Sequence, residues 1–591
     1  MNQIDQRNQT DQMNQHSISP DGESFPLPKP EDFTAELRRL QELVAGQRLM
    51  GREIVVVLGL GFVGAVMAGV IADSVDRKTG KPLKFVLGMQ RPSSRSYWKI
   101  PYINRGIAPV EAEDPEVAPL IRRCVLEKKT LSATFTYEAL TLADVVVVDV
   151  QCDYHKETLG DVKRGRADIA ALEESFRIIG EKIRPDCLVL IETTVPPGTT
   201  ENIAFPIIKK AFERRGLSAI NNQQSSIVNP SASRPINNHQ SSIVNRQSSI
   251  FNAAEPLLAH SFERVMPGRN YVSSIRDFWR VCSGINAEAR ERVTKFLSDV
   301  LNVQKYPLTV LDRPIESETC KIVENSYRAT ILAFLHEWST FAERNGVDLI
   351  KVIEAIKVRP THSNILFPGP GIGGYCLPKD GGLGFWAYQT LMGFEDDIFH
   401  LTPLAININD TRALHAAQLV RDGLRNMGKT VAASKISVLG ASYREDVGDT
   451  RYSGSEILVR KLTEMGAEVV VHDPYVKHWW ELEKQDSYPA DGQHRARYFR
   501  NQEKLKGLQV LQDLSRAMKG SDAVVLAVRH QPYLELDPDQ VFQMVGKPFA
   551  VIDCFGILDD SRISRYFELK CEVKGLGRGH IQRIKEQVRG H

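Results

Sequence analysis

A glycine-rich stretch that delivers a cysteine and an acid is the segment with the clearest chemical potential. Residues 369–380 read Gly-Pro-Gly-Ile-Gly-Gly-Tyr-Cys-Leu-Pro-Lys-Asp, which places Asp380 four residues after Cys376. Glycines let the backbone approach a ligand closely. A cysteine presented there is a candidate nucleophile, and the acid is a candidate base or orienting group. A single cysteine is also often an inert buried residue, so a catalytic role needs partners for the thiol.

Candidate partners lie on a predicted helix upstream of the cysteine. Glu318, Lys321 and Asn325 are spaced i, i+3 and i+7, so they share one face of that helix. A lysine near a thiolate lowers the pKa of the thiol and can stabilise a developing oxyanion. Spacing alone leaves a solvated helix face as the alternative interpretation.

A second glycine motif has the context of a dinucleotide site. Gly59-Leu-Gly61-Phe-Val-Gly64 follows a predicted strand and opens a predicted helix. The glycines permit a tight turn and close approach of a pyrophosphate, and the helix N-terminus offers free N–H groups. We therefore predict cofactor binding by five residues: Gly59, Gly61, Phe62, Val63 and Gly64. The similar spelling at 369–374 is not a second site of this kind, because Pro378 follows and no helix is expected to open after it.

The end of the second predicted strand bears on the choice of cofactor. An acid at this place usually binds the ribose hydroxyls of NAD. The strand instead ends in Gly88-Met89-Gln90-Arg91. Gln90 can hydrogen-bond a hydroxyl but carries no charge, and Arg91 favours a 2′-phosphate. The hypothesis is that NADP is used as well as, or instead of, NAD.

The overall composition argues against several classes of protein. The chain has 591 residues and a net charge of +2, which does not favour nucleic acid as a partner. None of its eight cysteines forms a Cys-x-x-Cys pair, so we expect no metal site and a reducing, cytoplasmic location. The N-terminus lacks the apolar core of a secretory signal. Residues 54–72 carry no charge, but their glycines indicate a buried strand, loop and helix rather than a membrane span.

The elements that must position these motifs form two α/β series. Apolar runs predict strands at residues 54–58, 85–89, 143–150, 188–192, 435–439, 468–472, 523–527 and 550–553. Helical patterns between them favour parallel, doubly wound sheets. Residues 316–357 and 404–427 read as long helices between the two series. The predicted fold class is therefore α/β, with two Rossmann-like doubly wound domains joined by a central all-α segment.

Composition shifts along the chain set the domain boundaries. We expect a disordered tail at 1–30, a dinucleotide-binding domain at 31–315, a helical segment at 316–430 and a second α/β domain at 431–591. The theme Gln-Ser-Ser-Ile recurs at 224–227, 240–243 and 247–250, so residues 218–256 are predicted to be a low-complexity insertion. The mildly basic residues from Lys574 to His591 are expected to be a solvated tail.

Taken together, the motifs resemble those of the nucleotide-sugar dehydrogenases, which include the UDP-glucose, UDP-N-acetylhexosamine and GDP-mannose 6-dehydrogenases. The similarity covers about 50–580 apart from the insertion, and the order and spacing match. The segments that carry it are Gly59–Gly64, Glu-Thr-Thr-Val-Pro-Pro-Gly at 192–198, Ser-Phe-Glu-Arg-Val-Met-Pro-Gly at 261–268, Lys321-x-x-x-Asn325, 371–380, and Gly-Ala-Ser-Tyr-Arg-Glu-Asp-Val-Gly-Asp-Thr-Arg at 440–451.

The resemblance implies a four-electron oxidation of a sugar C6 hydroxymethyl group to a uronic acid. Cys376 would hold the aldehyde as a thiohemiacetal and then as a thioester. Lys321 would stabilise the oxyanion with Asn325 beside it. Asp380 would act as base, or activate water with Lys321, and Glu263 would lie near that water.

The resemblance also implies binding roles and an assembly. Thr194 would join the cofactor site, and NAD would be the cofactor. The substrate would be a nucleotide-sugar used in polysaccharide biosynthesis, with two copies of the chain forming a dimer through the helical middle. The implied substrate-binding residues are Lys321, Asn325, Gly374, Arg359, Arg444 and Arg451.

Departures from the family pattern keep two alternatives open. Gln151-Cys152 stands where the family usually has Thr-Pro, and Phe262 stands for a usual proline. Together with Gln90, these changes motivate a catalytically impaired nucleotide-sugar-binding homologue. A β-hydroxyacid dehydrogenase would share the N-terminal architecture and a helix lysine, but it needs neither Cys376 nor a second α/β domain. The segment at 261–268 leans toward N-acetylhexosamine substrates.

Overall fold

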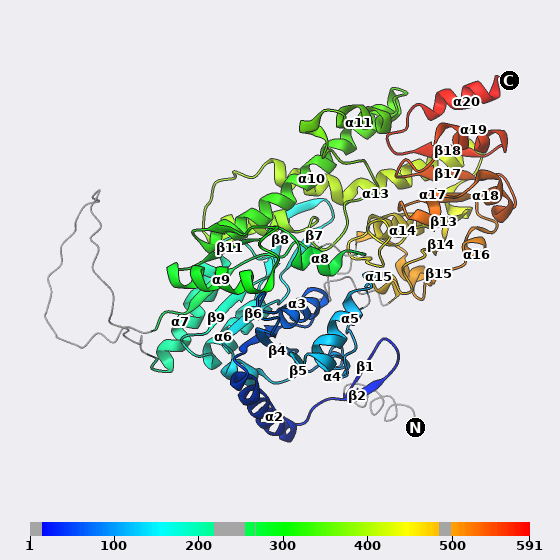
Figure 1. Cartoon of the computed structure of the whole chain (residues 1–591). Helices are drawn as coiled ribbons and strands as arrows, with labels where there is room; N and C mark the ends of the chain where they lie inside the picture. Colours follow the sequence, from blue (N-terminus) through cyan, green and yellow to red (C-terminus); the bar gives the residue numbers. More distant parts are fainter. Residues whose placement is uncertain (1–14, 111, 218–253, 266–267, 484–497, 591) are drawn as a thin grey trace, which may run out of the picture.

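Two α/β domains are joined by long central helices (Figure 1). The computed structural model describes residues 15–110, 112–217, 254–265, 268–483 and 498–590. The predicted α/β fold class is confirmed, with a mostly parallel sheet on one side of a helical middle and a parallel sheet on the other. Nearly all of the predicted insertion at 218–256 lies outside the described residues.

The N-terminal sheet has eight strands in the order β12-β11-β10-β9-β6-β3-β4-β5. All neighbours pair in parallel except β10 and β11. The strands are β3 (Glu53–Leu58), β4 (Lys84–Met89), β5 (Leu131–Thr134), β6 (Val145–Val148), β9 (Leu188–Ile191), β10 (Leu257–His260), β11 (Val281–Gly284) and β12 (Thr309–Leu311). The helices are α3 (Phe62–Asp73), α4 (Lys99–Asn104), α5 (Val117–Arg122), α6 (Ala170–Lys182), α7 (Phe205–Arg214), α8 (Tyr271–Arg276) and α9 (Ala287–Val300).

The uncharged run at 54–72 forms β3, a tight turn and α3, as predicted. The strand is buried on both faces because helices cover both sides of the sheet. In the described part of the chain, no helix is long and apolar enough to cross a membrane.

The N-terminal arm corrects the expected disordered tail at 1–30 for residues 15–30, and residues 1–14 lie outside the described residues. Residues 15–29 contain a two-stranded hairpin, β1 (His16–Ile18) with β2 (Ser24–Pro26), followed by α2 (Pro30–Leu49). The hydroxyl of Ser17 accepts a hydrogen bond from the Trp98 amide at 3.1 Å, and Tyr102 donates to Ser19 at 2.8 Å. Polar composition indicated disorder, but these polar groups form hydrogen bonds with α4 and with the residue that precedes it.

The helical middle consists of α10 (Pro314–Arg344), α11 (Leu349–Lys357), α12 (Asp380–Trp386) and α13 (Leu401–Asn426). α10 and α13 pack against each other, and α13 continues along β17 and β18 of the C-terminal sheet. A second hairpin, β7 (Asp153–Thr158) with β8 (Asp161–Asp168), packs on α12 and α13. The hairpin is held there by a buried ion pair in which Lys156 Nζ lies 2.6 Å from Asp410 Oδ2.

The C-terminal sheet is fully parallel, in the order β15-β14-β13-β16-β17-β18. Numbered within the domain this is 3-2-1-4-5-6, the Rossmann order. The strands are β13 (Lys435–Leu439), β14 (Glu468–His472), β15 (Val510–Leu511), β16 (Ala523–Leu526), β17 (Ala550–Asp553) and β18 (Glu572–Gly575). The helices are α14 (Gly454–Glu464), α15 (Trp480–Glu483), α16 (Leu514–Met518), α17 (Gln531–Leu534), α18 (Pro538–Val545), α19 (Asp560–Glu568) and α20 (Ile581–Arg589).

The predicted solvated tail at 574–591 is wrong. The segment supplies the end of β18 and the helix α20, which buries Ile581 and Ile584 against the domain core. Arg583 and Arg589 are exposed, whereas Lys585 is buried and pairs with Glu572, so the basic composition of this segment does not indicate a solvated tail.

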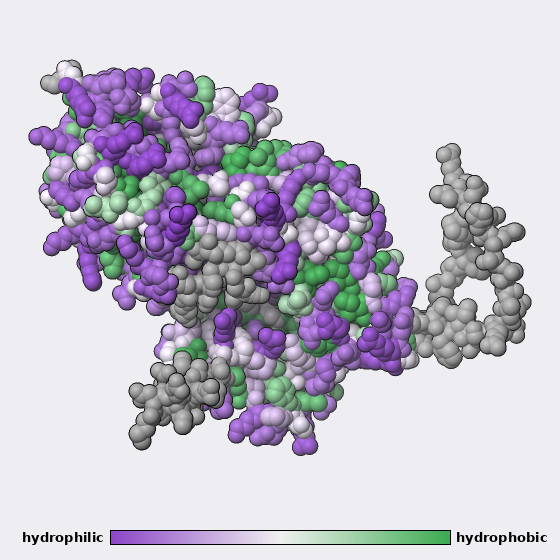
Figure 2. Space-filling model, turned by 180° about the vertical axis from the view of Figure 1, so that it is seen from behind, coloured by the Kyte–Doolittle hydropathy of each residue, from purple (hydrophilic) through white to green (hydrophobic). Residues whose placement is uncertain are grey.

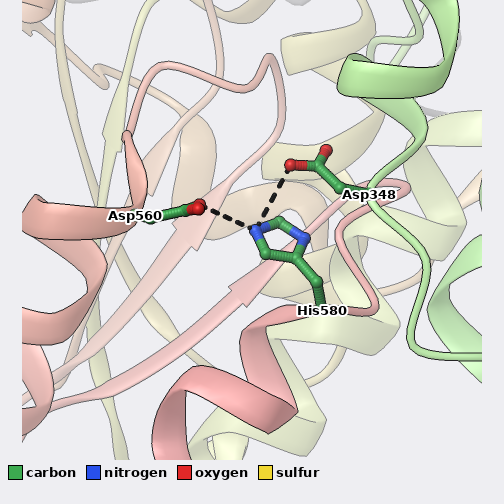
Figure 3. Close-up of side chains that lie close together, drawn as sticks. All are labelled: Asp348, Asp560 and His580. Atoms are coloured by element: carbon green, nitrogen blue, oxygen red, sulfur yellow. Dashed lines mark hydrogen bonds and ion pairs between the residues drawn. The ribbon is translucent and has the colours of Figure 1, made fainter.

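An ion cluster joins the helical middle to the C-terminal domain (Figure 3). His580 Nε2 lies 3.1 Å from Asp560 Oδ1 and 3.4 Å from Asp348 Oδ2. Lys351 contacts Asp560 at 2.6 Å, and Arg578 lies 3.5 Å from Asp348. Both carboxylates therefore have cationic partners, and the cluster is explained as an ion-pair network that docks the two parts.

Candidate active site

The cysteine loop is shaped by contact with the C-terminal domain. Gly373 and Gly374 have φ angles of +54° and +76°, which favour glycine. A Cβ at either position would collide with Tyr443, and the backbones of Gly371 and Gly454 also meet closely. The Gly374 amide donates to the Arg451 carbonyl at 2.9 Å. The glycines therefore permit a close approach to protein as well as to a ligand.

The three predicted residues of α10 are all buried, which excludes the alternative of a solvated helix face. Lys321 Nζ donates to the Glu263 carbonyl at 2.9 Å and lies 4.0 Å from the Glu263 carboxylate. Asn325 donates to Asp380 Oδ2 at 2.6 Å. Glu318 turns elsewhere: its carboxylate accepts hydrogen bonds from Gly198 and Thr200. The structure thus brings together Lys321, Asn325, Asp380 and Glu263 and leaves Glu318 as a cap of a neighbouring loop.

Lys379 is a residue of this site that sequence reasoning missed. Its ammonium lies 3.0 Å from Asp380 Oδ1, and both side chains are almost fully buried. Losing one partner of such a pair costs about 3–5 kcal/mol, because the other charge is left buried. The ammonium also lies 4.5 Å from the ring centroid of Tyr375, whose hydroxyl donates to Asp153. The sequence signal that could have identified Lys379 is its position directly before the proposed base, Asp380.

A short helix, α12, begins at Asp380, against the expectation that no helix opens after the loop. The conclusion that 369–374 is no dinucleotide site still stands, because no strand leads into it. The amides of Lys379 and Asp380 both donate to the Cys376 carbonyl, at 3.1 and 3.0 Å. This turn fixes the spacing between the thiol and the acid.

The surroundings of Cys376 favour the protonated form of its thiol. Burial, and then the Asp380 carboxylate, raise the pKa of Cys376 to about 11, while Lys321 opposes them. Burial would lower the pKa of Lys321, but Glu263, Cys376 and Asp380 outweigh it and raise that pKa. Lys321 therefore lowers the pKa of the Cys376 thiol, as expected, but burial and Asp380 raise that pKa by more.

We expect alkylation of Cys376 by iodoacetamide to be slow at pH 7 and to speed up about tenfold per pH unit as the pH rises toward 11, because only the thiolate reacts. At a fixed pH, Asp380→Asn should accelerate the reaction and Lys321→Ala should slow it. Mass spectrometry of the modified peptide measures the rate, with the partly exposed Cys320 as internal reference. A rate that stays constant between pH 7 and 9 would contradict the raised pKa.

The glycine loop at Gly59–Gly64 fits the pyrophosphate of a dinucleotide. Gly59 has a φ of +102°, and a Cβ at Gly64 would collide with the Gly59 carbonyl, so the turn demands both glycines. A Cβ at Gly61 would meet no protein atom, so the space beside the N-terminus of α3 is open. Phe62 stacks on Tyr271 with ring centroids 4.7 Å apart.

Carboxyl groups at the ends of neighbouring strands lie close to this loop. Asp149 follows β6 and Glu192 follows β9, where Glu192 accepts a hydrogen bond from Arg280 at 2.8 Å. Burial, and then the charges of Glu192 and Glu263, raise the pKa of Asp149 well above its ordinary value. This favours a neutral acid beside the glycine loop. Sequence reasoning missed Asp149, although an acid directly after a parallel strand is a recognisable signal.

The remaining predicted residues divide by location. Arg451 lies between the two loops: its guanidinium carbon is 5.3 Å from the Phe62 ring centroid and 5.5 Å from that of Tyr375. Thr194 is buried after β9, and Arg444 is half-buried in the segment that faces the cysteine loop. Arg359 is exposed beyond the end of α11. Its expected role across a subunit boundary stays a prediction.

The departures from the family pattern have structural partners. The Cys152 carbonyl accepts a hydrogen bond from Tyr375 at 3.1 Å, so this segment braces the cysteine loop. The Phe262 ring lies 5.5 Å from Lys321 Nζ and 5.2 Å from the Arg264 guanidinium carbon. The Phe262 ring therefore lies against the Lys321 ammonium group, an arrangement that favours the cationic form of the lysine.

Two Rossmann-type domains, one of them with a dinucleotide loop facing a cysteine site, define a dinucleotide-dependent oxidoreductase. Three models of one family match the chain: the NAD binding domain over residues 53–238, the central domain over 315–410 and the UDP binding domain over 437–560. The chain therefore belongs to the UDP-glucose/GDP-mannose dehydrogenase family. It is an oxidoreductase that acts on a nucleotide-sugar, and NAD is its indicated cofactor.

Relatives span almost the whole chain. UDP-N-acetyl-D-mannosamine dehydrogenase of Pyrococcus horikoshii is 25% identical over 532 residues, which cover 89% of this chain and 100% of that protein. NDP-N-acetyl-D-galactosaminuronic acid dehydrogenase of Ralstonia nicotianae is 24% identical and covers 86% and 97%. The solved structure of NDP-N-acetyl-D-galactosaminuronic acid dehydrogenase from Methanosarcina mazei superposes with a TM-score of 0.67 at 25% identity, covering 92% and 98%. A β-hydroxyacid dehydrogenase, the other enzyme considered, would not need the second α/β domain.

Proposed function

We propose that this protein oxidises the C6 hydroxymethyl group of a nucleotide-linked N-acetylhexosamine to the uronic acid, through covalent intermediates on Cys376. The observation that carries the proposal is the convergence of Cys376, Lys321, Asn325 and Asp380 on one site. The substrate class is supported by relatives whose names specify N-acetylmannosamine and N-acetylgalactosaminuronic acid.

The chemistry needs a nucleophile that retains the aldehyde between two oxidations. When bound, the nicotinamide accepts one hydride at each oxidation. The Cys376 sulfur adds to the aldehyde carbon, and the carbonyl oxygen takes up a proton to give a thiohemiacetal. Loss of the hydride and the hydroxyl proton leaves a thioester. Water then adds to the thioester carbon and the C–S bond breaks. The uronic acid is released, and Cys376 is again a free thiol.

The surrounding residues have distinct parts in these steps. Lys321 is positioned by the Glu263 carbonyl and stabilises negative charge on the reacting oxygen. Asp380 is fixed from two sides by Asn325 and Lys379, so it takes a proton only in a defined direction. Glu263 lies beside Lys321 and is the residue we assign to the hydrolytic water.

The test is the stoichiometry of reduced cofactor with a panel of sugars. We expect two NADH for each UDP-N-acetylhexosamine consumed, followed by absorbance with UDP-ManNAc, UDP-GlcNAc, UDP-GalNAc, UDP-glucose and GDP-mannose. Formation of one NADH with release of aldehyde would refute the thioester route. Binding without turnover of any sugar would instead support the impaired homologue.

We also propose that the protein is a homodimer that pairs along α10. Five large apolar side chains of this helix are about half exposed: Val323, Tyr327, Phe334, Trp338 and Phe341. Their spacing of 4, 7, 4 and 3 residues places them on one stripe. Figure 2 shows that one face of the molecule is mostly hydrophilic, with compact hydrophobic patches. A stripe of five exposed, large apolar side chains is typical of a surface that pairs with another chain.

Trp338→Glu is expected to convert the dimer to a monomer, because it buries a charge in the proposed interface. Light scattering during gel filtration should give a mass near twice the chain mass of 66.3 kDa for the parent and near one chain mass for the variant. Trp279→Glu changes a tryptophan of the N-terminal domain that is also about half exposed, and this variant should stay dimeric. A parent protein of one chain mass would contradict the proposal.

A further inference from the structure

The end of β4 carries no acid, and its glutamine is turned toward the glycine loop. Gln90 Oε1 accepts a hydrogen bond from the Leu60 amide at 2.9 Å, and its Nε2 lies 3.4 Å from the Ser96 hydroxyl. In a Rossmann domain that selects NAD, an acid here binds the ribose 2′-hydroxyl and repels a 2′-phosphate. Here the side chain at that position is neutral and its acceptor is engaged with the loop. The repulsion that excludes NADP is therefore missing.

Positive charge gathers at the same place. Lys99 Nζ donates to the Leu60 carbonyl at 3.0 Å and is half-buried, and Arg91 directly follows Gln90. Within the described residues, neither cation has a carboxylate within ion-pair distance. Burying an ammonium group without an anion is costly, so a phosphate arriving beside it gains the interaction that the protein does not supply.

Two acids of α2 act on this segment, and both are engaged elsewhere. Asp32 and Glu36 of α2 both act on the neighbouring Tyr97. Asp32 accepts a hydrogen bond from the Lys29 amide, and Glu36 binds Arg39 and the Thr134 hydroxyl. Their charges are thereby partly offset, and they do not neutralise the two cations at the end of β4.

The segment between the two cations is held in a fixed shape. The hydroxyls of Ser93 and Ser96 lie 2.7 Å apart, and Ser96 donates to the Arg91 carbonyl at 3.1 Å. The N-terminal arm anchors the far end, where Ser17 accepts from the Trp98 amide. Further along, Arg105 makes a two-bond ion pair with Glu23. A preorganised loop loses little entropy when it binds a ligand.

We propose that Arg91, Lys99 and the Ser93–Ser96 hydroxyl pair bind the ribose 2′-phosphate of NADP, so that NADP binds more tightly than NAD. This inference rests on the proposed function, because it assumes that a nicotinamide dinucleotide occupies the Gly59–Gly64 loop. The N-terminal arm then serves as the brace of the phosphate site.

The test is direct binding by the full-length protein, without sugar. Titrations followed by nucleotide fluorescence should show NADPH binding at least about tenfold more tightly than NADH, the effect expected of a single charge-assisted contact. As a competitor, 2′,5′-ADP should displace NADPH more effectively than 3′,5′-ADP, which has the same charge with the phosphate on the other hydroxyl. Equal displacement would show that charge alone decides and would overturn a 2′-specific site.

Variants separate the residues of the proposed site from general charge. Arg91→Ala and Lys99→Gln should each weaken NADPH binding about tenfold and leave NADH binding nearly unchanged. Gln90→Asp should reverse the preference, because it restores the repelling acid. Lys81→Ala removes an exposed charge near the opposite end of β4 and should change neither affinity.

The outcomes distinguish this inference from the proposed function. Binding of NADH as tight as that of NADPH, or variants that weaken both nucleotides equally, would overturn the 2′-phosphate site and leave the proposed oxidation intact. Failure of both nucleotides to bind would overturn the two together.

Discussion

Cys376→Ser is expected to abolish formation of the uronic acid. A serine hydroxyl is a far weaker nucleophile than a thiolate at the same place, so the aldehyde is no longer captured efficiently. We expect the rate of acid formation to fall at least about 1,000-fold while nucleotide-sugar binding is retained. The reaction should stop at a slowly released or trapped aldehyde-level adduct. Quenched reactions analysed by mass spectrometry would identify the product.

The matched control is Cys320→Ser. Cys320 is the other partly exposed cysteine among the described residues, and it is adjacent to Lys321 in sequence. It has no assigned role, so this variant should keep parent activity. Full acid production by Cys376→Ser would show that the thiol is not the nucleophile.

Lys321→Ala is expected to lower kcat about 100- to 1,000-fold and to change KM much less. The ammonium is buried and oriented by the Glu263 carbonyl, so it stabilises an oxyanion without having to reorganise. An interaction made mainly in the transition state affects kcat more than binding. Steady-state kinetics with the preferred sugar give both constants.

Arg328→Ala serves as the control, since it removes an exposed cation two turns further along α10. Thermal unfolding of both variants shows whether the fold survives, because the loss of a buried cation also leaves Glu263 less well compensated. An unchanged kcat in Lys321→Ala would refute the transition-state role.

The cofactor loop could be predicted from sequence because its determinants are local. A buried strand, three spaced glycines and an apolar helix follow one another within residues 53–73, and the structure contains them in that order. The long helices of the middle segment were also predictable from their periodicity. Spacing could not decide between a buried and a solvated position for Lys321, because the pattern of one helix does not say what packs on it.

The contacts that complete the cysteine site could not be predicted, because they join distant parts of the chain. Tyr375 reaches Asp153 across 222 positions in sequence, and Lys321 reaches Glu263 across 58. Gln90 was recognised as unusual, but its bond to Leu60 depends on how two loops meet in space. The predictions for residues 15–30 and 574–591 failed for a related reason. Polar or charged composition was taken to indicate exposure, whereas Ser17 and α20 are fixed by contacts with other parts of the chain.

Tyr443 makes the shape of the cysteine loop depend on the C-terminal domain. Its side chain fills the space that a Cβ at Gly373 or Gly374 would need, so the cysteine loop takes its shape from a wall that another domain provides. We therefore expect substitutions that displace Tyr443 to move the cysteine loop as well. A fragment that ends after α13 lacks the surface against which Gly373 and Gly374 of the cysteine loop pack.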